Sequence, residues 1–264
     1  MSATDDLCAA WSAIDLDSKA LALSDDLMLL RKNPRTSVTH TYEASLEEAA
    51  ARDGDERLHL SLLPQPYIGD LNKARVILLM LNPGLGPMDY YAELSGQRDG
   101  AFRSAVVSNL RQEGNRTYPF FFLDPAFLWH PGATFWRKRL NWIVRELSAE
   151  YGRTYDESLR YVAQHVCCLQ LVPYHSAEFG LTSGIVKQLP STKLVVAAAR
   201  EIAAGGHRLL AVMRKDKLWN LKPSEFVVQS APAHRRGAFV TSGSDLANRI
   251  LVTLSTFQSP SART

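Results

Sequence analysis

Six consecutive apolar residues, Val76 to Leu81, lead directly into the turn Asn82-Pro83-Gly84. A strand that is apolar at every position is covered on both faces, as in a parallel sheet between layers of helices. In open α/β sheets, ligands bind beyond the carboxyl ends of such strands. Asn, Pro and Gly are also common in ordinary surface turns. The stretch therefore predicts a buried strand that ends either in a ligand site or in a plain turn.

Three further apolar segments alternate with helical patterns along the chain. The four expected strands cover residues 74–81, 165–174, 208–213 and 225–230. The expected helices cover residues 5–31, 43–53, 96–115, 132–152, 191–206 and 242–257. The apolar face of the helix 132–152 comprises Phe135, Leu140, Ile143, Val144 and Leu147. This alternation predicts an α/β protein, a three-layer α/β/α sandwich around a central, mostly parallel four-stranded sheet.

The same pattern divides the chain into three parts. Residues 1–62 are expected to form a helical N-terminal extension packed on the core, in which the stretch KNPRTS separates two helices. Residues 63–257 are expected to form the α/β domain. Residues 258–264 read as a disordered tail.

The composition favours a globular protein of the cytoplasm. Hydrophobic residues make up 46% of the 264 positions, and no apolar run approaches the roughly 20 residues that span a membrane. The opening stretch MSATDDLCAAWSAIDLD carries acids where a signal peptide carries bases. A net charge of +3 permits a polyanionic partner without requiring one. We expect a monomer with no membrane partner and no cofactor.

The cysteine content argues against a metal or cluster site. Three cysteines, Cys8, Cys167 and Cys168, are too few for a four-cysteine zinc or iron–sulfur site. The two adjacent ones lie on an expected strand, where neighbouring side chains point to opposite faces. We therefore expect buried free thiols and no metal.

Two ordered motifs resemble the uracil-DNA glycosylase superfamily. The strand and turn ILLMLNPGLG, residues 77–86, resemble its first motif in the N-P-G form of the mismatch-specific uracil and thymine branch and of the single-strand-selective branch. The segment HPGATFWRK, residues 130–138, is similar to the H-P-x-x-x-F-W-[KR] segment of the same branch. A looser third match places Arg236, Gly237, Phe239 and Asn248 at the spacing of an R-G-x-F…N pattern in the uracil branch. The resemblance covers residues 66 to 254.

The resemblance implies a role in base excision for the turn that ends the first strand. Cleavage of an N-glycosidic bond needs a water near the sugar and donors near the departing base. Asn82 takes the position that orients this water, and Pro83, Gly84 and Leu85 border the base. An amide is a weak base, so such an enzyme relies on electrostatic stabilisation and is slow. Gly84 replaces a Tyr of the uracil branch, which leaves room for larger bases.

The flipped base must also be stacked and read. Phe127 and Trp129, in the stretch PAFLWHP, are the aromatic candidates for stacking, although each can equally be a core residue. Gln170 stands where the family has a base-reading Asn, and it keeps both a donor and an acceptor. His175 is a second donor at the same sheet edge or a plain loop histidine.

The second active-site loop departs from the family pattern. The family has H-P-S or N-P-S there, whereas this chain has QSAPAHRRGAF. His234 is a replacement donor to the base, and Arg235 and Arg236 are candidates for DNA phosphate contacts. A solvated loop and a loss of catalysis are equally compatible with this loop.

Three functions remain open on the sequence. The first is a DNA glycosylase-like enzyme that acts on a flipped, damaged, mismatched or modified base in single- or double-stranded DNA. The second is a catalytically degenerate DNA- or nucleotide-binding protein of the same fold. The third is an unrelated small-molecule hydrolase or transferase on a generic α/β sheet, since a fold does not dictate a function.

Overall fold

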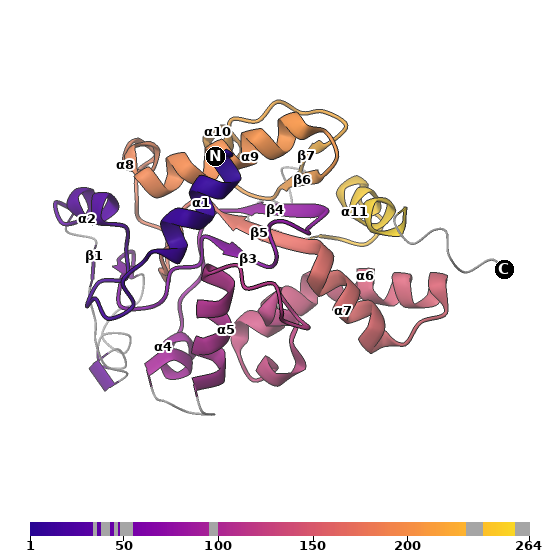
Figure 1. The fold of residues 1–264 in the computed structure, drawn as a ribbon, viewed down its shortest axis with the longest axis horizontal. Coiled ribbons are helices and arrows are strands. Elements are labelled where there is room, and N and C mark those ends of the chain that lie inside the picture. Colours follow the sequence, from indigo (N-terminus) through magenta and orange to yellow (C-terminus); the bar gives the residue numbers. More distant parts are fainter. Residues whose placement is uncertain are drawn as a thin grey trace. The chain divides into compact units, whose positions relative to one another are not determined.

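The computed structural model describes residues 1–33, 36–37, 43–44, 47, 55–94, 100–230 and 240–256. The chain forms two compact units, between which it passes several times. Unit 1 comprises Met1–Tyr67, Leu81–Glu113 and Leu169–Glu201. Unit 2 comprises Ile68–Met80, Gly114–Cys168 and Ile202–Thr264. Figure 1 shows the helices and strands with the labels used below.

The main sheet has five strands in the order β3-β5-β4-β6-β7. Their bounds are β3 Tyr67–Ile68, β4 Val76–Met80, β5 Val166–Gln170, β6 Leu209–Val212 and β7 Val227–Gln229. Strand β4 pairs in parallel with β6, with Val76 opposite Leu209, and β6 pairs in parallel with β7. All residues of β4, β5 and β6 are buried, as expected for strands covered on both faces.

The sheet has one strand more than the four expected from the sequence, and its edge differs in direction. The N–H of Gln170 donates to Pro66 O at 2.9 Å, and the N–H of Gln65 donates to Pro173 O at 2.8 Å. The segment that enters β3 therefore runs antiparallel to the segment that leaves β5, which makes the sheet mixed. β3 escapes prediction because it is only two residues long and follows the proline-rich stretch LPQP.

Unit 2 is built on a helical hairpin and a C-terminal helix that covers strands. Its elements are η2 Phe121–Leu123, η3 Pro125–Phe127, α6 Pro131–Tyr151, α7 Tyr155–His165, α10 Asp216–Trp219 and α11 Asp245–Ser255. Helix α6 starts at the N-cap His130 and ends at Gly152, whose positive φ of 59° suits a glycine. Thr154 and Glu157 form a capping box at the start of α7. Helices α6 and α7 lie side by side, and α11 packs on β4 and β6 (Figure 1).

Unit 1 contains the N-terminal helices and the helices that follow the turn at Asn82. Its elements are α1 Ala3–Ser12, α2 Ser24–Leu30, α4 Pro87–Leu94, α5 Ala101–Leu110, α8 Ser183–Gln188 and the paired strands β1 Thr36–Ser37 and β2 Leu58–His59. Helix α9, Pro190–Gly205, begins in this unit. Buried Asp26 of α2 accepts from the hydroxyl of Tyr174 at 2.6 Å and from the N–H of Ser191 at 3.1 Å. Through these two hydrogen bonds Asp26 ties α2 to the segment that follows β5. Burial raises the pKa of its carboxyl group.

Several local predictions need correction. The expected helix 5–31 is two helices, because the intervening stretch contains Asp15, Asp17 and Ser18, which favour turns. Phe135 is 36% exposed, and the guanidinium of Arg139 lies 3.3 Å from its ring centroid, so Phe135 does not belong to the buried face of α6. Cys167 and Cys168 are buried free thiols as predicted, whereas Cys8 is only half-buried.

Within the described residues, no helix is both long enough and apolar enough to cross a membrane. The described part of the expected helix 43–53 is limited to residues 43, 44 and 47, and the expected tail 258–264 lies outside the described residues.

Candidate functional site

The turn at Asn82 lies against the segment that leaves β5. The N–H of Val172 donates to Leu81 O at 2.8 Å, and the N–H of Ser176 approaches Pro83 O at 3.5 Å. The two segments therefore leave the sheet side by side within unit 1. This arrangement brings Asn82, Gly84 and His175 together.

Asn82 is held in one orientation by its amide nitrogen. The Nδ2 group donates to Pro83 O at 2.7 Å, to Ser176 Oγ at 2.8 Å and to Tyr174 O at 3.5 Å. Two of these partners are carbonyl oxygens, which only accept, so the nitrogen and not the oxygen of the amide must face them. Among the described residues, no group donates to Oδ1, and the side chain is half-buried. Asn82 thus presents a fixed acceptor.

His175 connects the turn to the strand-like segment before Pro64. Its Nδ1 lies 2.8 Å from Gly84 O and its Nε2 lies 3.2 Å from Leu63 O. Both oxygens only accept, so a neutral ring donates to one of them and a protonated ring donates to both. The side chain is buried, with 1% of the residue exposed. His175 is therefore a positioning residue for the backbone of the turn and does not project into open space.

The buried carboxyl group of Glu93 contacts Leu63, the residue whose carbonyl oxygen lies beside His175 Nε2. Glu93 Oε2 on α4 accepts from the N–H of Leu63 at 2.7 Å, and Arg103 Nη1 lies 3.8 Å from the same oxygen. No described group contacts the other carboxyl oxygen, Oε1. Burial raises the pKa of Glu93 from 4.5 to about 8, against the smaller lowering effects of the Leu63 N–H and Arg103. Near neutral pH the protonated form of Glu93 predominates.

A second buried hydrogen-bonded group links α4 to β2. His59 Nδ1 lies 2.7 Å from the hydroxyl of Tyr90, and His59 Nε2 lies 3.1 Å from Asp55 Oδ2. Two hydrogen bonds from Arg57 hold the carboxylate of Asp55 and contribute most to keeping its pKa well below the usual range. The N–H of His59 also donates to His175 O at 2.9 Å. The group fixes α4, and hence the end of the turn, to the same segment that His175 contacts.

Gln170, the last residue of β5, and Gln65, in the segment that enters β3, are buried amides on neighbouring segments. Gln170 is 3% exposed and Gln65 is 2% exposed. Neither Gln170 Oε1 nor Gln65 Nε2 has a hydrogen-bond partner among the described residues. A buried polar atom without a partner carries a desolvation penalty of about 1–3 kcal/mol. The two amides therefore leave one acceptor, Gln170 Oε1, and one donor, Gln65 Nε2, without a described partner.

The aromatic candidates lie in unit 2. Phe127 is 3% exposed within η3, whereas Trp129 is half-buried and donates from Nε1 to Ala126 O at 3.0 Å. Leu128, between them, is 49% exposed. The structure describes both aromatic residues within unit 2 and Asn82 within unit 1.

The second motif, HPGATFWRK, has local structural roles. His130 Nδ1 accepts from the N–H of Gly132 at 3.0 Å and so caps α6. A side chain at Gly132 would collide with the ring of Phe122. Trp136 is buried and packs edge-on against Phe120, with ring centroids 5.0 Å apart. Helix capping and packing therefore account for His130, Gly132 and Trp136.

The loop expected from the family resemblance to be the second active-site loop lies outside the described residues, and with it His234, Arg235 and Arg236. Of the third motif, only Asn248 is described, as an exposed residue of α11. In the described part of the chain, no group of three or more His, Cys, Asp or Glu side chains is placed to hold a metal ion.

Sequence reasoning missed Ser176, Leu63 and Glu93, which hold the turn. Ser176 and Asn82 are 94 residues apart in the chain. Leu63 acts through its backbone, which no residue type signals. A glutamate within an amphipathic pattern such as PMDYYAEL is most simply read as solvated. Only the position of His175, directly after the expected strand 165–174, gave a usable signal.

The space beside Gly84 allows a direct test of the turn. A Cβ atom at Gly84 would meet no heavy atom within 4 Å, whereas one at Gly132 would collide with Phe122. We expect Gly84→Tyr to change the free energy of unfolding by less than about 0.5 kcal/mol and Gly132→Ala to lower it by about 2 kcal/mol. Urea denaturation measures both. A large loss of stability for Gly84→Tyr would show that the space is filled.

No protein-family model, no curated protein and no solved structure matches the chain.

Proposed function

We propose that the protein is a DNA glycosylase-like hydrolase with a uracil-DNA glycosylase-like α/β/α fold. It takes a flipped base and cleaves its N-glycosidic bond with water. The proposal combines two sequence motifs with the location of Asn82 at the end of a buried strand. It does not require a metal or cofactor.

The anchored amide of Asn82 is the observation that carries this proposal. Its Nδ2 is occupied by Pro83 O, Ser176 Oγ and Tyr174 O, so its Oδ1 accepts from an incoming water. A fixed acceptor orients a water molecule without reorganising during the reaction. His175, through Gly84 O, holds the next part of the turn in place.

In this proposal the residues of the turn orient the reacting groups and do not act as a strong base. Asn82 orients the water and does not remove its proton, because an amide is not basic enough. The departing base leaves as an anion and needs donors. The atom of Gln170 that has no partner among the described residues is Oε1, which only accepts, so the candidate donors are Gln65 Nε2 and His234. Larger bases are admitted because Gly84 carries no side chain and has open space beside it.

A binding protein without catalysis is the second candidate. Two features favour it: no carboxylate stands at position 82, and the loop that contains His234 departs from the family pattern. Such a protein would use the buried amides of Gln65 and Gln170 to recognise a base and would leave the glycosidic bond intact.

A gel assay with modified oligonucleotides tests the function. The substrates carry uracil, mismatched thymine, hypoxanthine or a bulky base, in single and double strands, and alkali cleaves any abasic site formed. We expect cleavage at one or more modified bases. DNA binding without cleavage of any substrate would favour the binding protein, whereas absence of both would favour a small-molecule enzyme.

A further inference from the structure

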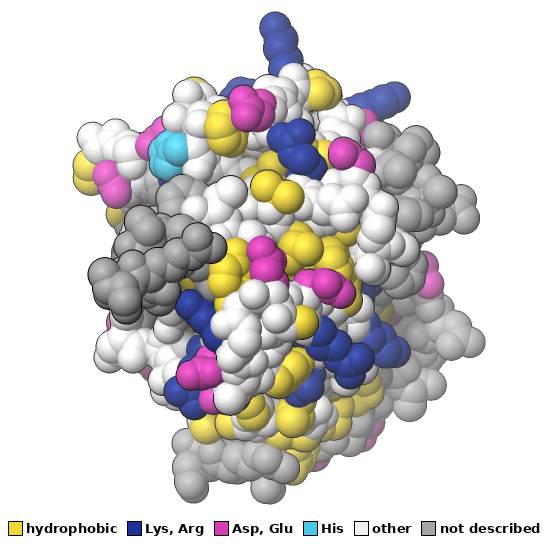
Figure 2. Space-filling model, turned by 90° about the vertical axis from the view of Figure 1, so that its right-hand side faces the viewer, with side chains coloured by type: hydrophobic (Ala, Val, Ile, Leu, Met, Phe, Trp, Pro, Cys, Tyr) yellow, Lys and Arg dark blue, Asp and Glu magenta, His cyan; other side chains and the backbone are white. Residues whose placement is uncertain are grey.

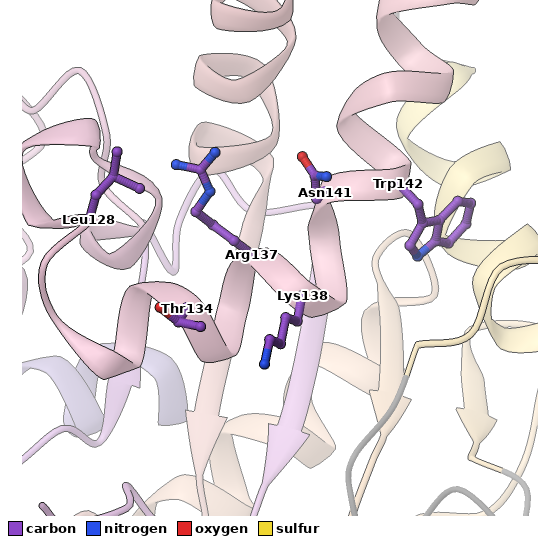
Figure 3. A pocket seen from close by; sticks show the side chains of 6 residues that line it. All are labelled: Leu128, Thr134, Arg137, Lys138, Asn141 and Trp142. Atoms are coloured by element: carbon purple, nitrogen blue, oxygen red, sulfur yellow. The ribbon is translucent and has the colours of Figure 1, made fainter.

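An open hollow lies on one face of α6, within unit 2. It has a volume of about 380 Å³. Its lining residues are Leu128, Thr134, Arg137, Lys138, Asn141 and Trp142. Figure 3 shows Arg137 extending between Leu128 and Asn141, while Trp142 lies at the far end of the row. A hollow of this size lies in the range of small-ligand sites, which begins at about 300 Å³.

The charge of this hollow is entirely positive. Arg137 and Lys138 contribute two cations, and no carboxylate is among the lining residues. Arg145 lies two turns after Lys138 on an exposed part of the same helix. In the described ranges of the chain, none of these three cations has an ion-pair partner, and the nearest acidic residue in sequence on α6 is Glu146. The set therefore attracts an anionic group.

This local set differs from the wider surface. Figure 2 shows the face turned toward the viewer from the right-hand side of Figure 1, and there basic and acidic side chains are interspersed. The net charge of +3 is thus not gathered into one field on this face. The two cations of the hollow stand out because they lie together beside an aromatic ring.

Trp142 is a rigid aromatic platform. Its Nε1 donates to Val240 O at 3.1 Å, which fixes the plane of the indole. The residue remains half-buried and lines the hollow with its ring. Asn141 is fixed likewise, because its Oδ1 accepts from the hydroxyl of Tyr155 at 2.6 Å. An aromatic face with cations beside it is the combination that binds single-stranded nucleic acid.

We propose that the hollow on α6 is a binding site for a strand of single-stranded DNA, in which Arg137 and Lys138 contact phosphates and Trp142 stacks on a base. The hollow is open, Lys138 is exposed and Arg137 half-buried beside it, and Asn141 and Trp142 are held by hydrogen bonds before binding. A polymer passes over such a surface with a phosphate at each nucleotide. This site lies outside the proposed catalytic turn and does not rest on glycosylase activity.

Fluorescence anisotropy of a labelled oligo-dT with the full chain tests this proposal. We expect the double variant Arg137→Gln and Lys138→Gln to bind more weakly and to lower the slope of log affinity against log salt by about 1.4, since each single-strand phosphate contact contributes about 0.7. The control is the double variant Lys187→Gln and Lys193→Gln, which removes the same charge from exposed positions of α8 and α9. It should bind as the unmodified protein does.

The stacking role has its own matched pair. Trp142→Leu should weaken binding by about 5- to 100-fold, because one stacked base contributes about 1–3 kcal/mol. Trp142→Phe keeps an aromatic face and should retain most of the affinity. Circular dichroism confirms that both variants are folded. If Trp142→Phe loses as much affinity as Trp142→Leu, the indole N–H bond and not stacking is what matters, and the platform is refuted.

Three results overturn the proposal. The first is an absence of oligo-dT binding by the unmodified protein at low salt. The second is an equal loss of affinity in the control with Lys187 and Lys193 replaced. The third is displacement of oligo-dT by thymidine monophosphate at the same nucleotide concentration, which would make the hollow a free-nucleotide site. None of these measurements involves cleavage, so they are independent of the proposed hydrolysis.

Discussion

Replacement of Asn82 by alanine is expected to lower the single-turnover rate of base excision by about 100- to 1,000-fold. The reason is that, in the proposed mechanism, Asn82 Oδ1 is the preorganised acceptor for the attacking water, held in place through three hydrogen bonds of Nδ2. DNA affinity should change little, because the amide contacts the protein's own backbone. The measurement is a single-turnover time course on whichever modified oligonucleotide the unmodified protein cleaves.

The free energy of unfolding does not separate a catalytic role of Asn82 from a structural one. The Nδ2 hydrogen bonds of Asn82 also fasten the turn, so Asn82→Ala should lower the free energy of unfolding by about 1 kcal/mol whether or not the residue acts in catalysis. Only the rate separates the two roles. Equal rates for the alanine variant and the unmodified protein would remove Asn82 from the mechanism.

Asn82→Asp gives a sharper comparison. The uracil branch carries a carboxylate at this position, so the family resemblance alone predicts that Asn82→Asp is faster than the unmodified protein. In this chain the group at Nδ2 faces Pro83 O and Tyr174 O, and a carboxylate there would be repelled by both. We therefore expect Asn82→Asp to be slower and less stable than the unmodified protein. Ser176→Ala, which removes one of the three acceptors, should lower the rate by about tenfold or less.

The sequence predicted β4, β5 and β6 because each is a run of apolar residues that is buried on both faces, and it predicted the shorter, partly buried β7 from the apolar pair Val227 and Val228. It also placed His175 at the same edge of the sheet as the turn at Asn82, as a donor or a plain loop histidine, because both residues follow the ends of predicted strands. These are local signals combined with one rule of sheet geometry. The two-residue strand β3 gave no periodicity to detect.

The remaining parts of the site depend on contacts that no local pattern encodes. Leu63 donates to Glu93 and faces His175, so its role depends on backbone atoms 30 and 112 residues away from their partners. The motif HPGATFWRK, by contrast, is a sequence pattern that resembles a functional motif but whose residues cap and pack a helix. His130 caps a helix and Gly132 packs on Phe122, so that motif alone does not identify a site.

The stability of the protein should fall as the pH rises from about 5 to about 8, because of Glu93. Burial raises the pKa of this carboxyl group from 4.5 to about 8 in the folded chain. Between these values the folded state holds a proton that the unfolded state releases, so the free energy of unfolding decreases with rising pH. Summed over the window, the loss attributable to Glu93 is roughly 3 to 5 kcal/mol. Urea denaturation at a series of pH values measures it.

Glu93→Gln tests the cause of this pH dependence. The amide oxygen still accepts from the N–H of Leu63, but the side chain does not ionise, so the fall in stability between pH 5 and 8 should flatten. Exposed Glu113→Gln is the matched control and should leave the curve unchanged.

The pH effect also distinguishes Glu93 from the charges around it. Arg103 on α5 stabilises the ionised form, while Asp89 on the same helix as Glu93 destabilises it, and burial exceeds both effects. Arg103→Gln should therefore raise the pKa of Glu93 further and extend the fall in stability to higher pH. If Glu93→Gln shows the same pH dependence as the unmodified protein, the carboxyl group is ionised in the fold and paired with Arg103. In that case Leu63, His175 and Gly84 would be held by a charged group at neutral pH.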